Sequence, residues 1–157
     1  MAPTLLTIGY EGCTIEEVLA SLRSARVDLL IDVRAVAASR KPGFSKRQLA
    51  AGLDRAGIGY IHLQRLGTPR PGREAVRSGH PERMVPIFLA HMETPDAVAA
   101  LADAKSLANE RRCCLLCFER DHLRCHRHLV AEMIVDETGQ PVENLEVPFP
   151  GLATHLS

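Results

Sequence analysis

Residues 27–34 read Val-Asp-Leu-Leu-Ile-Asp-Val-Arg, and this stretch decides the fold. Its almost unbroken apolar run is typical of a strand buried on both faces, because a strand with one solvent-facing side would alternate polar and apolar residues. Such strands lie in parallel sheets that helices cover on both sides. Asp32 and Arg34 stand at the carboxyl end of the run. The stretch therefore predicts an α/β fold with a polar group at one edge of the sheet.

The flanking sequence alternates strands and helices. Further strands are predicted for four short apolar runs, at 5–8, 59–63, 113–118 and 142–147. Helices are predicted after the capping boxes Thr14–Glu17 and Ser45–Gln48, around 84–89, from Thr94, and over 122–134. This alternation predicts right-handed βαβ units. We expect a single α/β domain over 1–157, whose mainly parallel sheet of about five strands is flanked by helices on both faces.

Two segments are predicted to be irregular. Residues 64–80 hold no convincing hydrophobic period, and loops of this length in compact domains are usually functional or disordered. We predict a mobile lid or binding loop there. Residues 148–157 are predicted to be a loose C-terminal tail.

Composition indicates a cytoplasmic protein with no membrane partner. The chain has 157 residues, of which 46% are hydrophobic, enough for one substantial core. No apolar stretch approaches the roughly 18–20 residues that a membrane span requires, and no secretory signal is visible. The five cysteines are an odd number with poor spacing for a disulfide framework, so we expect reduced thiols.

Charge is balanced overall but unevenly distributed. The chain has 19 basic and 19 acidic residues, yet residues 34–83 hold eleven Lys or Arg against three Asp or Glu, a local net charge of +8. This asymmetry predicts an anionic partner, either a small molecule or a nucleic acid, unless acidic residues from elsewhere neutralise the segment in the folded chain.

Three polar segments follow predicted strands, at 9–12, 32–34 and 117–127. Because ligands of parallel sheets bind outside the carboxyl ends of the strands, we expect these segments to converge on one site. The convergence is a prediction from topology and does not depend on any single motif.

The segment from Cys117 to Arg127 is the densest polar cluster in the chain. It opens a predicted helix, whose free N–H groups favour a thiolate or a phosphate. Cys117 or Cys125 could be that thiolate, with His126 as general acid or base. A cysteine-phosphatase loop would have the form Cys-x5-Arg, but Leu123 stands five residues after Cys117. The segment therefore predicts thiol or anion chemistry without specifying a phosphatase.

A metal site is an alternative interpretation of the same segment. Five side chains suited to Zn²⁺ lie within a dozen residues: Cys117, His122, Cys125, His126 and His128. Their spacing is not that of a zinc finger or ribbon. Cys114 and Cys117 are three residues apart in a predicted strand, so their side chains should point to opposite faces. Buried cysteines of this kind are also ordinary core residues.

An ordered set of short motifs runs through the chain: Thr7-Ile-Gly-Tyr10, Asp32-Val-Arg34, Ser39-Arg40, Phe44, Tyr60, Leu66-Gly67, Leu116-Cys-Phe-Glu119 and Cys125-His-Arg127. In order and spacing this set resembles the domain-of-unknown-function family 488, over residues 5 to about 135. The family's name states that its function is not established.

The resemblance implies a compact prokaryotic α/β domain with its hallmark residues at the strand ends. It adds Tyr10, Ser39 and Phe44 to the ligand-binding candidates. The chain departs from the family pattern at 36–38, where a proline is common, and at 67–68, where two glycines are common. These departures make the path of the 35–44 loop and of the following segment less predictable.

The leading hypothesis is an enzyme acting on a nucleotide or another phosphorylated small molecule. Arg34, Arg40 and Arg127 would bind anionic oxygens, and Cys117 is a further ligand-binding candidate. Asp32, Glu119 or His126 would transfer protons, and Cys125 would be nucleophile or orienting group. The rivals are a nucleic-acid-binding module using the basic segment 34–83, and a zinc-stabilised structural domain. The sequence indicates no particular cofactor or oligomeric state.

Overall fold

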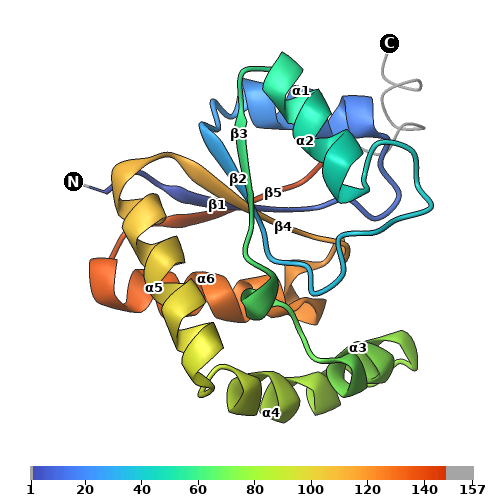
Figure 1. The fold of residues 1–157 in the computed structure, drawn as a ribbon, viewed down its shortest axis with the longest axis vertical. Coiled ribbons are helices and arrows are strands. Elements are labelled where there is room, and N and C mark those ends of the chain that lie inside the picture. Colours follow the sequence, from blue (N-terminus) through green and yellow to red (C-terminus); the bar gives the residue numbers. More distant parts are fainter. Residues whose placement is uncertain (1, 148–157) are drawn as a thin grey trace.

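A computed structural model describes residues 2–147 and contains a single parallel sheet (Figure 1). The strand order is β3–β2–β4–β1–β5. The strands are β1 (Leu5–Gly9), β2 (Leu29–Asp32), β3 (Gly59–His62), β4 (Cys113–Cys117) and β5 (Val142–Leu145). The predicted α/β fold with a parallel sheet of about five strands is confirmed.

Helices cover both faces of this sheet. One face carries α1 (Ile15–Ser24) and α2 (Lys46–Arg55), and the other carries α4 (Pro81–His91), α5 (Pro95–Glu110) and α6 (His126–Thr138) (Figure 1). Helix α3 (Arg70–Arg77) packs against α4. Two short 3-10 turns, at Gln64–Leu66 and His122–Arg124, precede α3 and α6. The result is a three-layer sandwich with the sheet in the middle.

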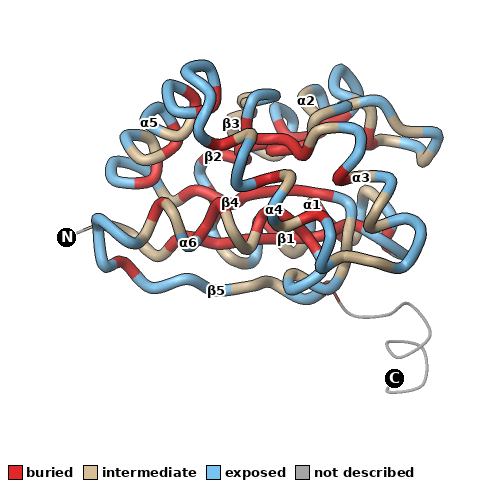
Figure 2. Tube along the Cα trace, turned by 90° about the horizontal axis from the view of Figure 1, so that it is seen from below, coloured by how far each residue is buried: buried red, intermediate tan, exposed pale blue. Residues whose placement is uncertain are grey.

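Strand β4 shows how the apolar sequence fills both layers. Cys113, Leu115 and Cys117 join the core under α4, α5 and α6, whereas Cys114 and Leu116 join the core under α1 and α2. Alternate side chains of a strand point to opposite faces, so an unbroken apolar run serves both cores. Figure 2 shows the central strands as buried and much of β5, at the sheet edge, as exposed.

The register brings three strand ends level with one another. Gly9 at the end of β1 pairs with Cys117, and Asp32 at the end of β2 pairs with Leu116. Strand β4 lies between β1 and β2, although those two precede it in sequence. The loops after these three strands therefore leave the sheet side by side, as the topology predicted.

The two expected capping boxes have different outcomes. Thr14 and Glu17 form theirs at the start of α1, as predicted. The box at Ser45 and Gln48 is wrong, because both side chains bind the preceding loop instead of the helix end. The Ser45 hydroxyl donates to the Ser39 carbonyl, and Gln48 Oε1 accepts from the Gly43 N–H. These bonds fix the 35–44 loop.

The predicted irregular loop at 64–80 is wrong, since most of it is the 3-10 turn and α3. Pro71 lies in the first turn of α3, where its missing N–H costs nothing. Ala75 and Val76 are the apolar residues of this helix, too few to show a period. Helix α6 begins at His126 and not at the predicted His122, because the 3-10 turn intervenes.

Residues 148–157, where a loose tail was predicted, lie outside the described residues. Within 2–147, every helix is too short or too polar to cross a bilayer.

Gly9 offers a test of how closely the site-forming loops approach. A Cβ added there would lie 1.8 Å from the Glu119 carbonyl oxygen, which is backbone and cannot rotate away. We expect Gly9→Ala to lower the free energy of unfolding by about 1–3 kcal/mol, measured by urea denaturation. Gly52→Ala in α2 is the control, since its nearest contact is an ordinary 3.5 Å and alanine favours a helix. Equal stability of the two variants would contradict the close packing.

Candidate functional site

Asp32 and Arg34 form a buried ion pair at the end of β2. The Asp32 carboxylate accepts from Arg34 Nε at 2.9 Å and Nη2 at 2.7 Å, and from the Tyr60 hydroxyl at 2.6 Å. Arg34 Nη1 donates to the Tyr10 hydroxyl at 3.1 Å and to the Phe44 carbonyl at 2.8 Å. Burial alone would lower the pKa of Arg34, but its bonds and attraction to Asp32 raise it. Asp32 and Arg34 thus direct their hydrogen bonds to each other and to neighbouring protein groups.

Aromatic rings pack beside this network. Tyr10 stacks on the fully buried ring of Phe44, with centroids 4.3 Å apart. Phe118 meets Tyr10 edge-on at 5.4 Å and is 46% exposed. Phe44 is thus support for Tyr10, whereas Phe118 presents part of its ring to solvent.

Arg127, near the start of α6, holds the loop that follows β4. Its guanidinium is buried and donates to Thr7 Oγ1 at 3.2 Å, to Cys117 Sγ at 3.0 Å, and to the carbonyls of Glu119 and Arg120. These acceptors are neutral, and within residues 2–147 no carboxylate forms a salt bridge with Arg127. Burial lowers the pKa of Arg127 to about 10. A nearby anion would therefore stabilise it.

Cys125 is the N-cap of α6, and His126 follows it. The Cys125 sulfur accepts from the Arg127 N–H and lies 3.7 Å from His126 Nδ1. His126 Nε2 lies 2.7 Å from the Val33 carbonyl, which can only accept, so Nε2 carries the proton. Burial lowers the pKa of His126 to about 4. The neutral ring therefore presents the unprotonated Nδ1 to the Cys125 sulfur.

Cys117 and Cys125 are joined by a disulfide, with an S–S distance of 2.04 Å. The expectation that all five cysteines are reduced thiols is thus wrong for this pair. It failed because the loop from β4 folds back under Arg127 and brings the two sulfurs together, which the spacing of eight residues did not reveal. Cys13, Cys113 and Cys114 are free and buried.

A cavity of about 380 Å³, the cysteine pocket, lies beside this disulfide. Both cysteines and His126 line it, and so do residues of α3. Val36 and Phe118 are exposed apolar residues in its lining. Of the residues predicted for the site, seven line this pocket: Tyr10, Arg34, Ser39, Cys117, Glu119, Cys125 and His126.

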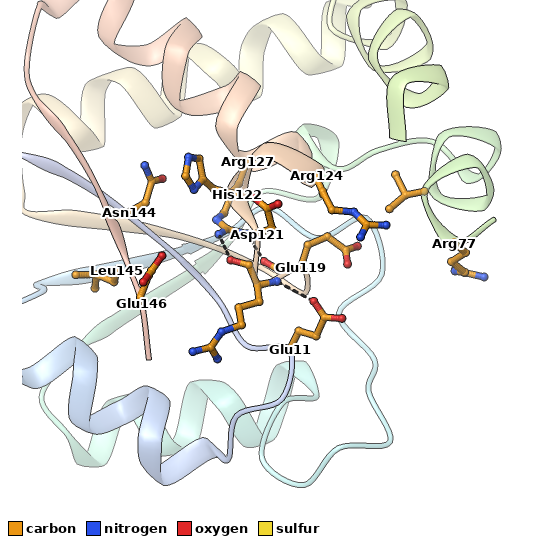
Figure 3. A pocket seen from close by; sticks show the side chains of 12 residues that line it. Glu11, Arg77, Glu119, Asp121, His122, Arg124, Arg127, Asn144, Leu145 and Glu146 are labelled. Atoms are coloured by element: carbon orange, nitrogen blue, oxygen red, sulfur yellow. Dashed lines mark hydrogen bonds between the residues drawn. The ribbon is translucent and has the colours of Figure 1, made fainter. Parts of the chain in front are cut away.

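A second cavity of about 550 Å³, the outer pocket, lies on the β5 side of the same loop (Figure 3). Arg77, Glu119 and Arg124 line both pockets, so the two adjoin. Figure 3 shows the Glu119 and Arg124 side chains beside each other, with Arg77 across from them on α3. Burial, and then repulsion by Glu11, raise the pKa of Glu119.

Four predicted site residues lie elsewhere. Asp32 and Phe44 are fully buried behind Arg34, and Arg127 is buried and reaches only the outer pocket. Arg40 is exposed and lines neither cavity. The topology argument thus placed the strand ends correctly, but it could not separate residues that face the cavity from residues that support it.

The small-molecule hypothesis had not included the arginines of α3. Arg73, Val76 and Arg77 share one face of this helix and line the cysteine pocket. Their i, i+3, i+4 spacing is the signal that could have identified them. It was hidden because the segment contains so few apolar residues.

The rival interpretations rest on charge and on metal ligands. Several basic side chains of 34–83 are paired in the fold: Arg34 with Asp32, Arg65 with Asp96 and Arg70 with Glu74. In the part of the chain that the structure describes, no group of three or more His, Cys, Asp or Glu side chains could hold a metal ion. Neither rival gains an observation in its favour.

The Arg34 network predicts a stability effect. We expect Arg34→Leu to lower the free energy of unfolding by roughly 3–5 kcal/mol, because it leaves the buried Asp32 carboxylate without its cation. Arg70→Leu, which breaks an exposed pair with Glu74, should cost less than about 1 kcal/mol. Urea denaturation compares the two. If Arg34→Leu were as stable as Arg70→Leu, Arg34 would not be a structural residue.

His126 predicts a pH dependence of stability. Its pKa is about 4 in the folded chain and about 6.5 when unfolded, so the unfolded state binds the extra proton between these values. Neutral His126 therefore contributes about 3 kcal/mol to the free energy of unfolding. This contribution is fully present above pH 6.5, decreases as the pH is lowered, and is lost below about pH 4. Denaturation at pH 4 and pH 7 should show a smaller difference for His126→Gln than for the wild type. Equal differences would place the folded pKa near its ordinary value.

Comparison with known protein families identifies a match. The family model described as "Domain of unknown function DUF488" matches residues 14–134, more than half of the chain. No curated protein and no solved structure matches. The matched region contains β2, β3, β4, the disulfide and most of the cysteine pocket. The chain belongs to the DUF488 family of domains of unknown function.

Proposed function

We propose that the protein is an enzyme acting on a nucleotide or another phosphorylated small molecule bound in the cysteine pocket. The observation that carries the proposal is that Cys125 and His126 line the same cavity as Arg73, Arg77 and Arg124. A potential nucleophile, its base and several cationic groups therefore share one cavity. That combination is suited to group transfer.

Three arginines would bind the anionic group. Arg77 and Arg124 are exposed, line the pocket, and have no hydrogen-bonded or salt-bridged partner within residues 2–147. Arg73 donates to the Thr68 carbonyl at 2.9 Å, which holds its guanidinium at the wall. Guanidinium groups match the geometry of phosphate oxygens. These residues replace Arg34 and Arg40 in the binding role, since Arg34 is committed to Asp32 and Arg40 lies outside the pocket.

An apolar surface in the same pocket favours a nucleotide over a simple phosphate. Phe118 is 46% exposed and Val36 is 54% exposed, and both line the cavity. Tyr10 braces the Phe118 ring from the side. A nucleobase stacked on Phe118 would remove this apolar surface from water.

The chemistry would begin once an external dithiol reduces the Cys117–Cys125 bond and is itself oxidised to a disulfide. Nδ1 of His126 then accepts the proton of the Cys125 thiol, and the free N–H groups of α6 stabilise the thiolate. Glu119, whose pKa burial raises, would protonate the leaving group. Asp32 keeps a structural role through Arg34, because its carboxylate is fully bonded.

Ligand-induced thermal stabilisation tests the proposal. Reduced protein is heated with nucleotides, sugar phosphates and inorganic phosphate, and a ligand at 100 times its Kd should stabilise by about 2.7 kcal/mol. Arg77→Ala or Arg124→Ala should weaken binding about tenfold or more, since each loses a charge-assisted bond. Arg23→Ala, an exposed arginine on α1 at the other sheet face, should leave affinity unchanged.

Turnover is then measured with each compound that binds. Cys125→Ser should retain binding and lose turnover, since it removes the nucleophile and leaves the arginine wall intact. Absence of any shift across the panel, or full turnover by Cys125→Ser, would refute the proposal.

A further inference from the structure

Cys117 and Cys125 differ from the other cysteines in where they lie. Both line the cysteine pocket, and their sulfurs are bonded. Cys13, Cys113 and Cys114 are free, buried, and absent from the lining of that pocket. Burial also raises the pKa of the Cys113 thiol to about 11. A compound that enters the pocket therefore meets only the bonded pair.

Cys125 has the surroundings of an attacking thiol. As N-cap of α6 it occupies the position where free backbone N–H groups stabilise a thiolate. His126 Nδ1 lies 3.7 Å from its sulfur and is unprotonated, because Nε2 is the atom that donates to Val33. The proton of a Cys125 thiol thus has an acceptor beside it.

Cys117 has the surroundings of a resolving thiol. It is the disulfide partner of Cys125. Arg127 Nη1 lies 3.0 Å from its sulfur, and the other acceptors of that guanidinium are neutral oxygens. A Cys117 thiolate would place a negative charge in direct contact with the buried Arg127 guanidinium, in a charge-assisted bond. Both thiols of the pair can therefore become anions by separate means.

We infer that the pair is a catalytic dithiol–disulfide couple that reduces small anionic disulfides in the cysteine pocket. Cys125 is the attacking thiol and Cys117 the resolving thiol. The inference rests on the proposed function only in using the same pocket and the same nucleophile. It adds a redox activity to the group transfer proposed above.

The exchange balances in two steps. The Cys125 thiolate attacks one substrate sulfur, a Cys125–substrate bond forms, the substrate S–S bond breaks, and the other half leaves as a thiolate. The Cys117 thiolate then attacks the Cys125 sulfur, which restores the disulfide and releases the first half. The substrate gains two electrons and the cysteines lose two. Protons from the cysteine thiols pass to the released thiolates, and an external dithiol reduces the pair again.

The pocket lining specifies the class of disulfide. Arg77 and Arg124 favour a compound carrying carboxylates, and the exposed ring of Phe118 favours an aromatic or apolar body. A cavity of about 380 Å³ limits the substrate to a small molecule. Dithiobis(2-nitrobenzoate), an aromatic disulfide with two carboxylates, has these properties and releases a coloured thiolate. It serves as the probe.

The experiment uses the full chain, reduced with dithiothreitol and desalted. Mixed with one equivalent of the probe, the wild type should release both nitrothiobenzoate halves rapidly and retain no adduct. Cys117→Ser should release one half and keep the other as a mixed disulfide on Cys125, seen by mass spectrometry. Cys125→Ser should react about a hundredfold or more slowly. Cys113→Ala, on the same strand as Cys117, is the matched control and should behave like the wild type.

Peptide mapping of the reacted wild type identifies which cysteines are bonded or modified, and it does not require any variant to fold. A Cys117–Cys125 disulfide as the main product supports the inference. A stable adduct on Cys125, modification of Cys13, Cys113 or Cys114 at a comparable rate, or an undiminished rate for Cys125→Ser overturns it.

Charge selection gives a second readout. Arg77→Ala combined with Arg124→Ala should slow the reaction with the carboxylated probe about tenfold or more and leave that with neutral hydroxyethyl disulfide unchanged. Equal slowing of both would overturn the assigned substrate class. Phosphorylated ligands are absent from these assays. A chain that binds nucleotides without disulfide exchange would refute this inference alone, and exchange without nucleotide binding would refute only the proposed group transfer.

Discussion

The site depends on the hydrogen bonds that the buried guanidinium of Arg127 donates. This guanidinium reaches from α6 to Thr7 on β1, to the Cys117 sulfur at the end of β4, and to the carbonyls of Glu119 and Arg120. Backbone carbonyls held this way fix the path of the loop between β4 and α6. That path brings the start of α6 back against the end of β4. This path of the loop places Cys125 next to Cys117.

A second buried arginine at the same edge is held in a different way. Arg34 has a carboxylate, Asp32, within 2.7 Å, and the pair is completed by hydroxyls and a carbonyl. Both charges are compensated internally, so this pair can stabilise the ends of β2 and β3 without a ligand. Arg127 has only neutral acceptors in the described part of the chain. Arg34 is therefore compensated by a carboxylate within the fold, whereas the hydrogen bonds of Arg127 go to neutral acceptors.

The fold could be predicted well from the sequence because strands that are buried on both faces appear as continuous apolar runs. The apolar runs around Leu30 and Leu115 could only be central strands, and parallel topology then required their polar ends to converge. The site could be predicted less well. Helix α3 lacks a hydrophobic period because it packs mainly through α4, and nothing local distinguishes Arg34, which is committed to Asp32, from a ligand-binding arginine. Such distinctions depend on contacts between distant residues.

The roles of the arginines at this site depend on how deeply their side chains are buried. Arg77 and Arg124 lie exposed on the walls, where they can exchange water for a ligand's oxygens at little cost. Arg127 lies deeper, buried beside the Cys117 sulfur and absent from the lining of the cysteine pocket. Reduction would create an anion at this sulfur, and a charge-assisted bond from Arg127 would favour the thiolate of Cys117, the form that attacks a mixed disulfide. The cation that organises the loop therefore also favours the reactive form of one of the cysteines that the loop brings together.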